Sequence, residues 1–306
     1  MNSLRIGTRG SALARWQAEM VRERLAALSI PAELVLIRTS GDRDANTPLR
    51  TMGGKGIFIK ELEDALLDHR IDLAVHSMKD LPTELPADLA ISAICERHDV
   101  RDALVSRAGV GLDKLPPQAR VGTSSLRRQA QLLHRRPDLR MVEIRGNVDT
   151  RLEKVARGDY DAIVLAKAGV DRLGMADRIT EVLATEICLP AAGQGAIGIE
   201  TRRDDSAVVN VVGLLDHAAT RIAVAAERAV LAELEGGCLL PLGVWARMQE
   251  KEFIVEACVL AADGSESLRV KRTGLPCQAE DLGRGAAAEL RDRGAERLLR
   301  PVGRDR

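Results

Sequence analysis

The segment LRIGTRGS at residues 4–11 is echoed by VGTSS at residues 121–125. In both, a short apolar run ends in Gly-Thr, and a turn rich in hydroxyl groups follows, as is typical of a strand that leads into a helix. Such a turn leaves backbone N–H groups free at the positive end of a helix dipole, where carboxylate or phosphate binds. The repeat predicts two similar lobes with one anion-binding turn each, although so short a likeness also arises by chance.

Outward from these turns, short apolar runs alternate with helical periodicity. Apolar residues at positions 13, 16, 20, 21, 25 and 28 form one stripe of a helix expected over residues 12–28, and Ser11 is placed to cap its first turn. Strands are predicted at Leu4–Ile6, Leu34–Ile37, Leu73–Val75, Leu89–Ile94, Val121, Met141–Ile144 and Ala162–Leu165. The alternation of strands and helices indicates an α/β fold.

The pattern changes after Gly213. A long helix is expected from about residue 220 to residue 235, ending at Gly236-Gly237, a common C-terminal stop. Antiparallel strands are predicted at 244–248, 253–260 and 268–273, and a last helix at 279–292. These elements predict a small α+β domain after the two lobes, which fits a chain of 306 residues.

The composition restricts the class of function. Lys plus Arg and Asp plus Glu each number 45, so no global field attracts nucleic acid or an anionic membrane. The five cysteines and five histidines are scattered, without a Cys-x-x-Cys or His-Glu-x-x-His pattern, so neither a metal site nor a disulfide framework is expected. The N-terminus lacks the apolar stretch of a signal peptide, and residues 187–199 are too short and too broken to span a membrane. We therefore expect a cytoplasmic protein.

Positive charge is concentrated between residues 120 and 157, which hold ten Lys or Arg residues and four acidic residues. Arg127 and Arg128 fall in the first turn of a predicted helix, where cations oppose the dipole by roughly a few tenths of a kcal/mol unless an anion offsets them. A bound polyanion would provide the offset, and the planar fork of Arg suits carboxylates. The alternative is a solvated basic face, which suits the arginines of residues 135–140 better.

Two further residues stand in positions that favour chemistry. Asp80, in His76-Ser77-Met78-Lys79-Asp80, follows a predicted strand, and ligands bind at the carboxyl ends of strands in open α/β sheets. It is a candidate catalytic acid, or alternatively it caps a turn before Pro82.

Cys238 follows two glycines that leave its thiol accessible, whereas Cys95, Cys188 and Cys258 lie in apolar stretches typical of buried thiols. Cys238 alone would more often be structural than reactive.

Several blocks together resemble the porphobilinogen deaminase family along nearly the whole chain. They are RIGTR at 5–9 with Ser11 and Trp16-Gln17, GGKGIF at 53–58, AVHSMKDLP at 74–82, GTSSLRRQ at 122–129, RRPD at 135–138, RGNVDTRL at 145–152, PAAGQG at 190–195 and EGGCLLPLG at 235–243. Each block is weak alone, but their order is specific to the family.

The resemblance implies a mechanism. The residue that matches Cys238 carries a dipyrromethane cofactor through a thioether, and Asp80 matches the residue that hydrogen-bonds pyrrole N–H groups and assists proton transfer. Four porphobilinogen units join head to tail with loss of ammonia, and hydrolysis releases linear hydroxymethylbilane for heme biosynthesis. Since each ring carries two carboxylates, the resemblance also explains why a neutral protein gathers arginines.

The same matching implies the binding residues. Those expected to bind the cofactor besides Cys238 are Ser77, Lys79, Thr123, Ser124, Ser125, Arg127, Arg128, Asn147 and Arg151. Those expected to bind substrate are Arg9, Ser11, Lys55, Phe58, Arg145, Arg172 and Gln194. Phe58 is alternatively a core residue of a helix starting near Gly56, and the polar stretch at 41–56 is long enough to form a lid.

The architecture implied is two lobes like those of type II periplasmic binding proteins, plus a small C-terminal α+β domain. We expect residues 1–95 and 196–213 to form domain 1, 96–195 domain 2 and 214–306 domain 3, in a monomer whose partner is porphobilinogen, with no nucleic acid and no membrane. The main rival is a non-catalytic bilobal binder of a small carboxylate, which would need Arg9 and Arg127 but not Cys238. A cysteine hydrolase is a weaker rival, because no His falls in a motif that pairs it with Cys238.

Overall fold

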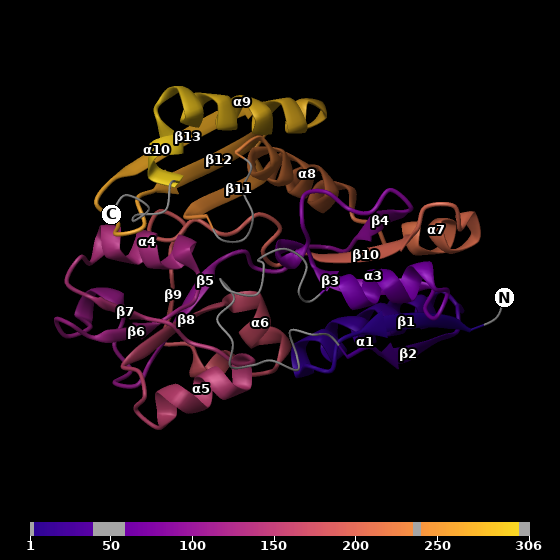
Figure 1. The fold of residues 1–306 in the computed structure, drawn as a ribbon, viewed down its shortest axis with the longest axis horizontal. Coiled ribbons are helices and arrows are strands. Elements are labelled where there is room, and N and C mark those ends of the chain that lie inside the picture. The colour runs from indigo at the N-terminus through magenta and orange to yellow at the C-terminus, as the bar shows by residue number, and fades with distance from the viewer. Residues whose placement is uncertain (1–2, 39–58, 235–239, 300–306) are drawn as a thin grey trace, which may run out of the picture. The chain divides into compact units, whose positions relative to one another are not determined.

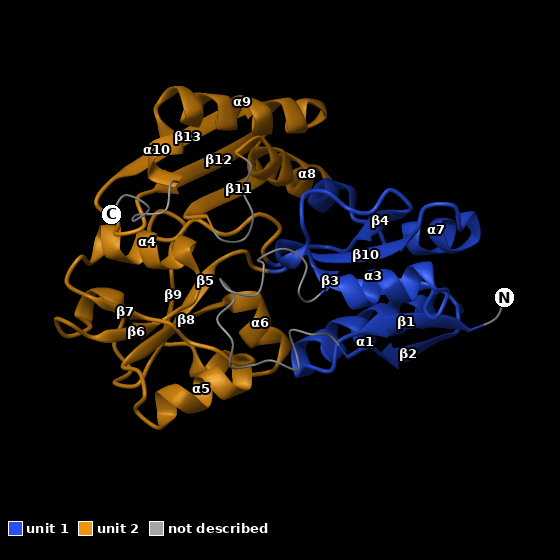
Figure 2. Cartoon of the chain, viewed as in Figure 1, with its two compact units in different colours: residues 1–98, 195–221 blue, residues 99–194, 222–306 orange. Residues whose placement is uncertain are grey.

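The computed structural model describes residues 3–38, 59–234 and 240–299. The chain divides into two compact units, which Figure 2 colours blue and orange. The first unit comprises residues 1–98 and 195–221, and the second comprises residues 99–194 and 222–306.

The first unit is built on a five-stranded sheet (Figure 1). Its strands are β1 (Leu4–Thr8), β2 (Ala32–Leu36), β3 (Leu73–Ser77), β4 (Leu89–Ile94) and β10 (Ile197–Arg202), in the order β2-β1-β3-β10-β4. β1 is parallel to β2 and β3, whereas β10 is antiparallel to both of its neighbours. The chain therefore returns to the first sheet after completing the second one.

Helices cover both faces of this sheet because successive strand residues point to opposite sides. Leu73 and Val75 pack in one core with α1 (Ala12–Ala27) and α7 (Ser206–Gly213). Ala74 packs in the other core with α3 (Lys60–Leu67).

The central sheet, in the second unit, repeats the first one. Its strands are β5 (Asp102–Ser106), β6 (Arg120–Gly122), β7 (Arg140–Val142), β8 (Ala162–Ala166) and β9 (Glu181–Val182), in the order β7-β6-β8-β5-β9. β6 is parallel to β7 and β8, and β5 is antiparallel to β8 and β9. β6 thus takes the place of β1, and β5 takes that of β10. The two Gly-Thr echoes end equivalent strands, so the prediction of two similar lobes is confirmed.

The remaining elements complete the second unit. Helices α4 (Leu126–Arg135), α5 (Val148–Ala156) and α6 (Lys167–Arg172) lie in the connections after β6, β7 and β8 of the central sheet. A three-stranded antiparallel sheet follows, with β11 (Leu242–Gln249), β12 (Glu252–Leu260) and β13 (Ser267–Gly274). Helices α8 (Ala218–Glu233), α9 (Ala279–Asp292) and α10 (Ala295–Leu299) pack on one face of it in a single core (Figure 1). The predicted C-terminal α+β domain is confirmed.

The predicted boundaries differ from the observed ones mostly at element ends. β7 ends at Val142, two residues before the predicted end. β5, β9 and β10 were not predicted: β5 and β9 are too short to show a clear period, and β10 ends in three polar residues that are nevertheless buried. The predicted stop at Gly236-Gly237 and the stretch 41–56 lie outside the described residues. No single helix in the described ranges is long and apolar enough to cross a membrane, and one bent pair, α7 with α8, passes that test by length and composition only.

Candidate active site

The turn that carries Asp80 follows directly from β3. The strand runs through His76 and Ser77 into a 3-10 turn, η1 (Met78–Asp80). Gly198 of β10 lies alongside, and a Cβ added there would lie 2.3 Å from Met78 Sδ. Because Gly198 has no side chain, Met78 is buried against β10. Asp80, two residues further along the turn, is exposed.

A buried pair of titratable groups fixes the strand just before this turn. His76 Nε2 lies 3.0 Å from Glu200 Oε2, and both side chains are almost fully buried. Glu200 Oε1 is also buried and has no hydrogen-bonding partner among the described residues. Because a buried carboxylate needs a partner, His76 is held firmly at this position.

The turn after β1 lies at the same sheet edge as η1, because β1 and β3 are parallel neighbours. Ser11 caps α1 as predicted, and its hydroxyl accepts a hydrogen bond from Ala14 N at 3.3 Å. Arg9 is half-buried beside it. Gln17 Nε2 of α1 donates to Ser77 Oγ at 2.8 Å, so the helix is tied to the end of β3.

In the equivalent turn after β6, three hydroxyl groups form hydrogen bonds that stabilise the backbone of the turn and its connection to neighbouring segments. Buried Thr123 accepts a hydrogen bond from Ser125 N at 3.2 Å, and Ser124 Oγ donates to Ile144 O at 2.5 Å. Ser125 Oγ caps α4 by accepting from Arg128 N at 3.5 Å. The turn is therefore rigid before any ligand arrives.

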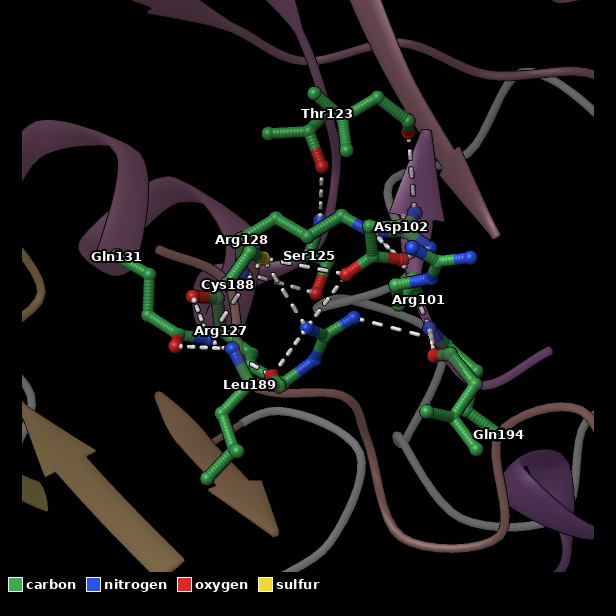
Figure 3. A network of polar contacts seen from close by, with 12 residues as sticks. Arg101, Asp102, Thr123, Ser125, Arg127, Arg128, Gln131, Cys188, Leu189 and Gln194 are labelled. Atoms are coloured by element: carbon green, nitrogen blue, oxygen red, sulfur yellow. Dashed lines mark hydrogen bonds and ion pairs between the residues drawn. The ribbon is translucent and has the colours of Figure 1, made fainter. Parts of the chain in front are cut away.

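Two buried arginines at the start of α4 share one buried carboxylate (Figure 3). Arg127 Nη1 lies 2.7 Å from Asp102 Oδ2, and Arg128 Nη2 lies 2.7 Å from Asp102 Oδ1. Gln194 Nε2 donates to Oδ1 at 2.9 Å, and the Cys188 thiol donates to Oδ2 at 3.2 Å. The network ties α4, β5 and the chain around residues 188–194 together.

The charges in this network are strongly coupled. Burial raises the pKa of Asp102, but the two guanidinium charges outweigh burial and hold that pKa well below its usual range. Burial lowers the pKa of Arg127, but the charge of Asp102 outweighs it and raises that pKa above its usual value. Burial and the same carboxylate raise the pKa of Cys188. Asp102 is therefore ionised and Arg127 is charged throughout the physiological range.

The anion that offsets the first-turn arginines is thus an internal one, whereas the sequence predicted a bound polyanion in that role. Arg127 also donates to Leu189 O at 2.7 Å, and both arginines are nearly fully buried. The sequence did not identify Asp102 as the counter-ion. It is the one acidic residue at the start of an apolar run, and that pattern does not indicate a partner on α4. Direct contact of Arg127 or Arg128 with a ligand carboxylate stays a prediction.

Arg145 has the opposite character. It follows β7 in the connection to α5, and 20% of its side chain is exposed. Its only ion-pair partner among the described residues is Glu143, at 3.4 Å from Nε, and its Nη2 atom is buried without a hydrogen-bonding partner. A buried guanidinium N–H without a partner is destabilising, so it suits an anionic ligand.

The other predicted residues are distributed as follows. Lys79 is half-buried in η1, Arg172 is half-buried at the end of α6, Asn147 is exposed before α5, and Arg151 Nε donates to Gly146 O at 2.7 Å. Lys55, Phe58 and Cys238 lie outside the described residues. In the ranges that the structure describes, no group of three His, Cys, Asp or Glu side chains is arranged for a metal ion.

Among solved structures, the chain is similar to the following three proteins. A YaeC-family lipoprotein from Enterococcus faecalis V583 is 13% identical with a TM-score of 0.44, over 70% of this chain and 91% of that chain. The methionine-binding protein MetQ is 15% identical with a TM-score of 0.45, over 70% and 89%. The VFT2 domain of BvgS from Bordetella pertussis is 18% identical with a TM-score of 0.38, over 69% and 85%.

Two family models match the chain in sequence order. One, described as "Porphobilinogen deaminase, dipyromethane cofactor binding domain", matches residues 4–210, which include both five-stranded sheets. The other, described as "Porphobilinogen deaminase, C-terminal domain", matches residues 221–292, which include the three-stranded sheet. Since the two matches together cover nearly the whole chain, it belongs to the porphobilinogen deaminase family.

Proposed function

We propose that this chain assembles hydroxymethylbilane from four porphobilinogen units on a dipyrromethane primer joined to Cys238 by a thioether. The family match carries the proposal, because both models are specific to enzymes of this transferase reaction. The primer, when bound, supplies the pyrrole carbon that is extended. The buried Nη2 atom of Arg145, which no described residue hydrogen-bonds, supports the fit, since pyrrole rings of this kind carry carboxylates.

Asp80 is proposed as the catalytic residue. It is exposed on η1 at the carboxyl end of β3, and it has no hydrogen-bonding partner among the described residues. A carboxylate in that situation accepts hydrogen bonds from pyrrole N–H groups and stabilises positive charge that develops during loss of ammonia. It also accepts and returns the proton that the substitution at carbon releases.

The basic side chains are proposed to divide into two groups. Arg9, Arg145, Arg151 and Arg172 would bind ligand carboxylates directly, because a planar guanidinium donates two parallel hydrogen bonds, and Lys79 would bind them through its ammonium group. Arg127 and Arg128 hold the turn at Thr123–Ser125 through Asp102, and their predicted contact with cofactor carboxylates is also part of the proposal. The remaining predicted contacts, by Ser11, Ser77, Asn147, Gln194, Lys55 and Phe58, are part of the same proposal.

Mass spectrometry with thiol counting tests the thioether. The intact chain should be heavier than its sequence by two pyrrole units, with the excess on the peptide that contains Cys238. In denaturant, an alkylating reagent should modify four of the five cysteines, since a thioether sulfur does not react. Cys277→Ser is the matched control because Cys277 is exposed and outside the proposed site; it should keep the excess mass and lose one labelled thiol. A fully active chain with five free thiols would disprove the attachment.

The rival reading, a non-catalytic carboxylate binder, requires Arg9 and Arg127 but no cysteine. Cys238→Ser should therefore abolish hydroxymethylbilane formation under our proposal and leave ligand binding intact under the rival one. We also propose a cytoplasmic monomer with the three domains bounded as predicted. Light scattering of the purified protein should give the mass of one chain.

A further inference from the structure

Four successive backbone carbonyls between β7 and α5 each accept a hydrogen bond from a side chain. The pairs are Glu143 O with Tyr160 Oη at 2.8 Å, Ile144 O with Ser124 Oγ at 2.5 Å, Arg145 O with Lys154 Nζ at 2.9 Å, and Gly146 O with Arg151 Nε at 2.7 Å. We call residues 143–146 the strap. Carbonyls in a surface connection ordinarily face water, so a donor on every one is unusual.

The donors come from three different parts of the second unit. Ser124 belongs to the turn after β6, Arg151 and Lys154 belong to α5, and Tyr160 precedes β8. Any shift of the strap would therefore break at least one of these four hydrogen bonds. Since a side-chain donor to each carbonyl replaces a mobile water, the backbone of Arg145 has one defined position.

Lys154 is the least expected of these donors. It is half-buried and forms no ion pair with any residue that the structure describes, although the basic segment around it contains acidic residues. Its ammonium group is directed to the Arg145 carbonyl instead. A charged donor makes a stronger hydrogen bond than a neutral one, and this contact is made to the backbone of Arg145 itself, so it fixes the position of that residue.

Tyr160, the one tyrosine of the chain, reaches the strap over a glycine. A Cβ on Gly122, the last residue of β6, would lie 2.9 Å from Tyr160 Cδ1. Because Gly122 has no side chain, the aromatic ring of Tyr160 can pack directly against the end of β6. Tyr160 is thereby placed so that its hydroxyl donates to Glu143 O.

Arg145, the third residue of the strap, is suited to bind an anion, because its Nη2 atom is buried and has no hydrogen-bonding partner in the part of the chain that the structure describes. We propose that Lys154 and Tyr160 are positioning residues for porphobilinogen: they fix the strap so that the Arg145 guanidinium is already oriented for a substrate carboxylate. The inference rests on the proposed function and deepens it. Neither residue touches substrate in this account, because both act through the backbone of Arg145 and its neighbours.

Steady-state kinetics on Lys154→Met tests the proposal. The variant keeps most of the aliphatic stem and removes the donor, and we expect KM for porphobilinogen to rise about tenfold, which corresponds to about 1.4 kcal/mol, with kcat within about twofold. Arg157→Met is the matched control. It removes the same charge from the end of the same helix, but Arg157 is exposed and, among the described residues, forms an ion pair only with Asp159 at 3.0 Å, so KM should stay within about twofold.

Two further variants separate positioning from a general effect on folding. Lys154→Arg retains a charged donor and should restore most of the wild-type KM, whereas Tyr160→Phe removes one hydroxyl and should raise KM about threefold without change in the unfolding midpoint. In an Arg145→Met background, Lys154→Met should have no further effect on KM, because it acts through Arg145. All variants should carry the two-pyrrole mass excess.

Equal KM values for Lys154→Met and Arg157→Met would overturn the inference, as would an additive effect in the Arg145→Met background. Should Lys154→Met fail to fold, the Tyr160→Phe result decides, and an unchanged KM there counts against the proposal. Failure of the proposed function is distinguishable, since a wild-type chain without mass excess or hydroxymethylbilane formation would refute it regardless of these variants.

Discussion

Replacing Asp102 with Asn is expected to destabilise the protein by about 3–5 kcal/mol, although the two side chains have nearly the same shape. Asp102 is fully buried and accepts five hydrogen bonds, from Arg127 Nη1, Arg128 Nε and Nη2, Gln194 Nε2 and Cys188 Sγ. The amide removes the negative charge and turns one acceptor into a donor that faces a guanidinium N–H. Two buried cations then have no counter-ion among the residues that the structure describes, which accounts for a loss of this size.

The free energy of unfolding, measured by urea titration with far-ultraviolet circular dichroism, is the assay. Asp113→Asn is the matched control, because exposed Asp113 pairs with exposed Arg135 at 2.8 Å and its loss should change stability by less than about 1 kcal/mol. A value for Asp102→Asn within about 1 kcal/mol of wild type would refute the reasoning. It would mean that the two guanidinium groups do not depend on this carboxylate.

The pH dependence gives the same test a second readout. Because the folded pKa of Asp102 is depressed, its contribution to stability is complete above the ordinary Asp pKa of about 3.9 and is lost as pH falls through the folded value. The stability of the wild type should therefore fall more steeply below about pH 4 than that of Asp102→Asn. Parallel curves for the two proteins would count against the assigned counter-ion.

The other predictions concern chemistry, packing and thiol reactivity. Asp80→Asn should lower kcat by about 10²–10⁴-fold while the mass excess of two pyrrole units is retained, and near-normal turnover would remove Asp80 from its catalytic role. Gly264→Ala should destabilise the protein by about 1–3 kcal/mol more than Gly109→Ala. Both glycines have positive φ, but a Cβ at position 264 would lie 2.4 Å from His134 N, whereas a Cβ at position 109 would meet nothing within 4 Å. Equal denaturation midpoints for the two variants would contradict this packing. In the native protein at pH 8, a maleimide should label exposed Cys277 and not Cys188 or Cys258, since burial raises the pKa of both thiols, that of Cys258 to about 11, and peptide mapping would detect any exception.

Periodicity in the sequence was sufficient for most of the fold. The strand at Leu89–Ile94, the helix at Ala279–Asp292 and the Ser11 cap were predicted at their observed positions, because each depends on local patterns of apolar and capping residues. The Gly-Thr echo also indicated two similar lobes. The same reasoning found Cys95, Cys188 and Cys258 buried, as apolar neighbours suggest.

The sequence by itself also determined the family and hence the reaction, because ordered motifs identify a lineage without any coordinates. Only the tertiary structure decided which charges meet. Asp102 and Arg127 are 25 residues apart, and Lys154 reaches the carbonyl of Arg145 from the far end of a helix, and no local pattern encodes either pairing. The order of the strands in a sheet determines which charged side chains and hydrogen-bond donors come into contact. That choice depends on long-range packing, and it gave Arg127 and Arg128 a buried internal counter-ion, whereas their contact with a ligand stays a prediction.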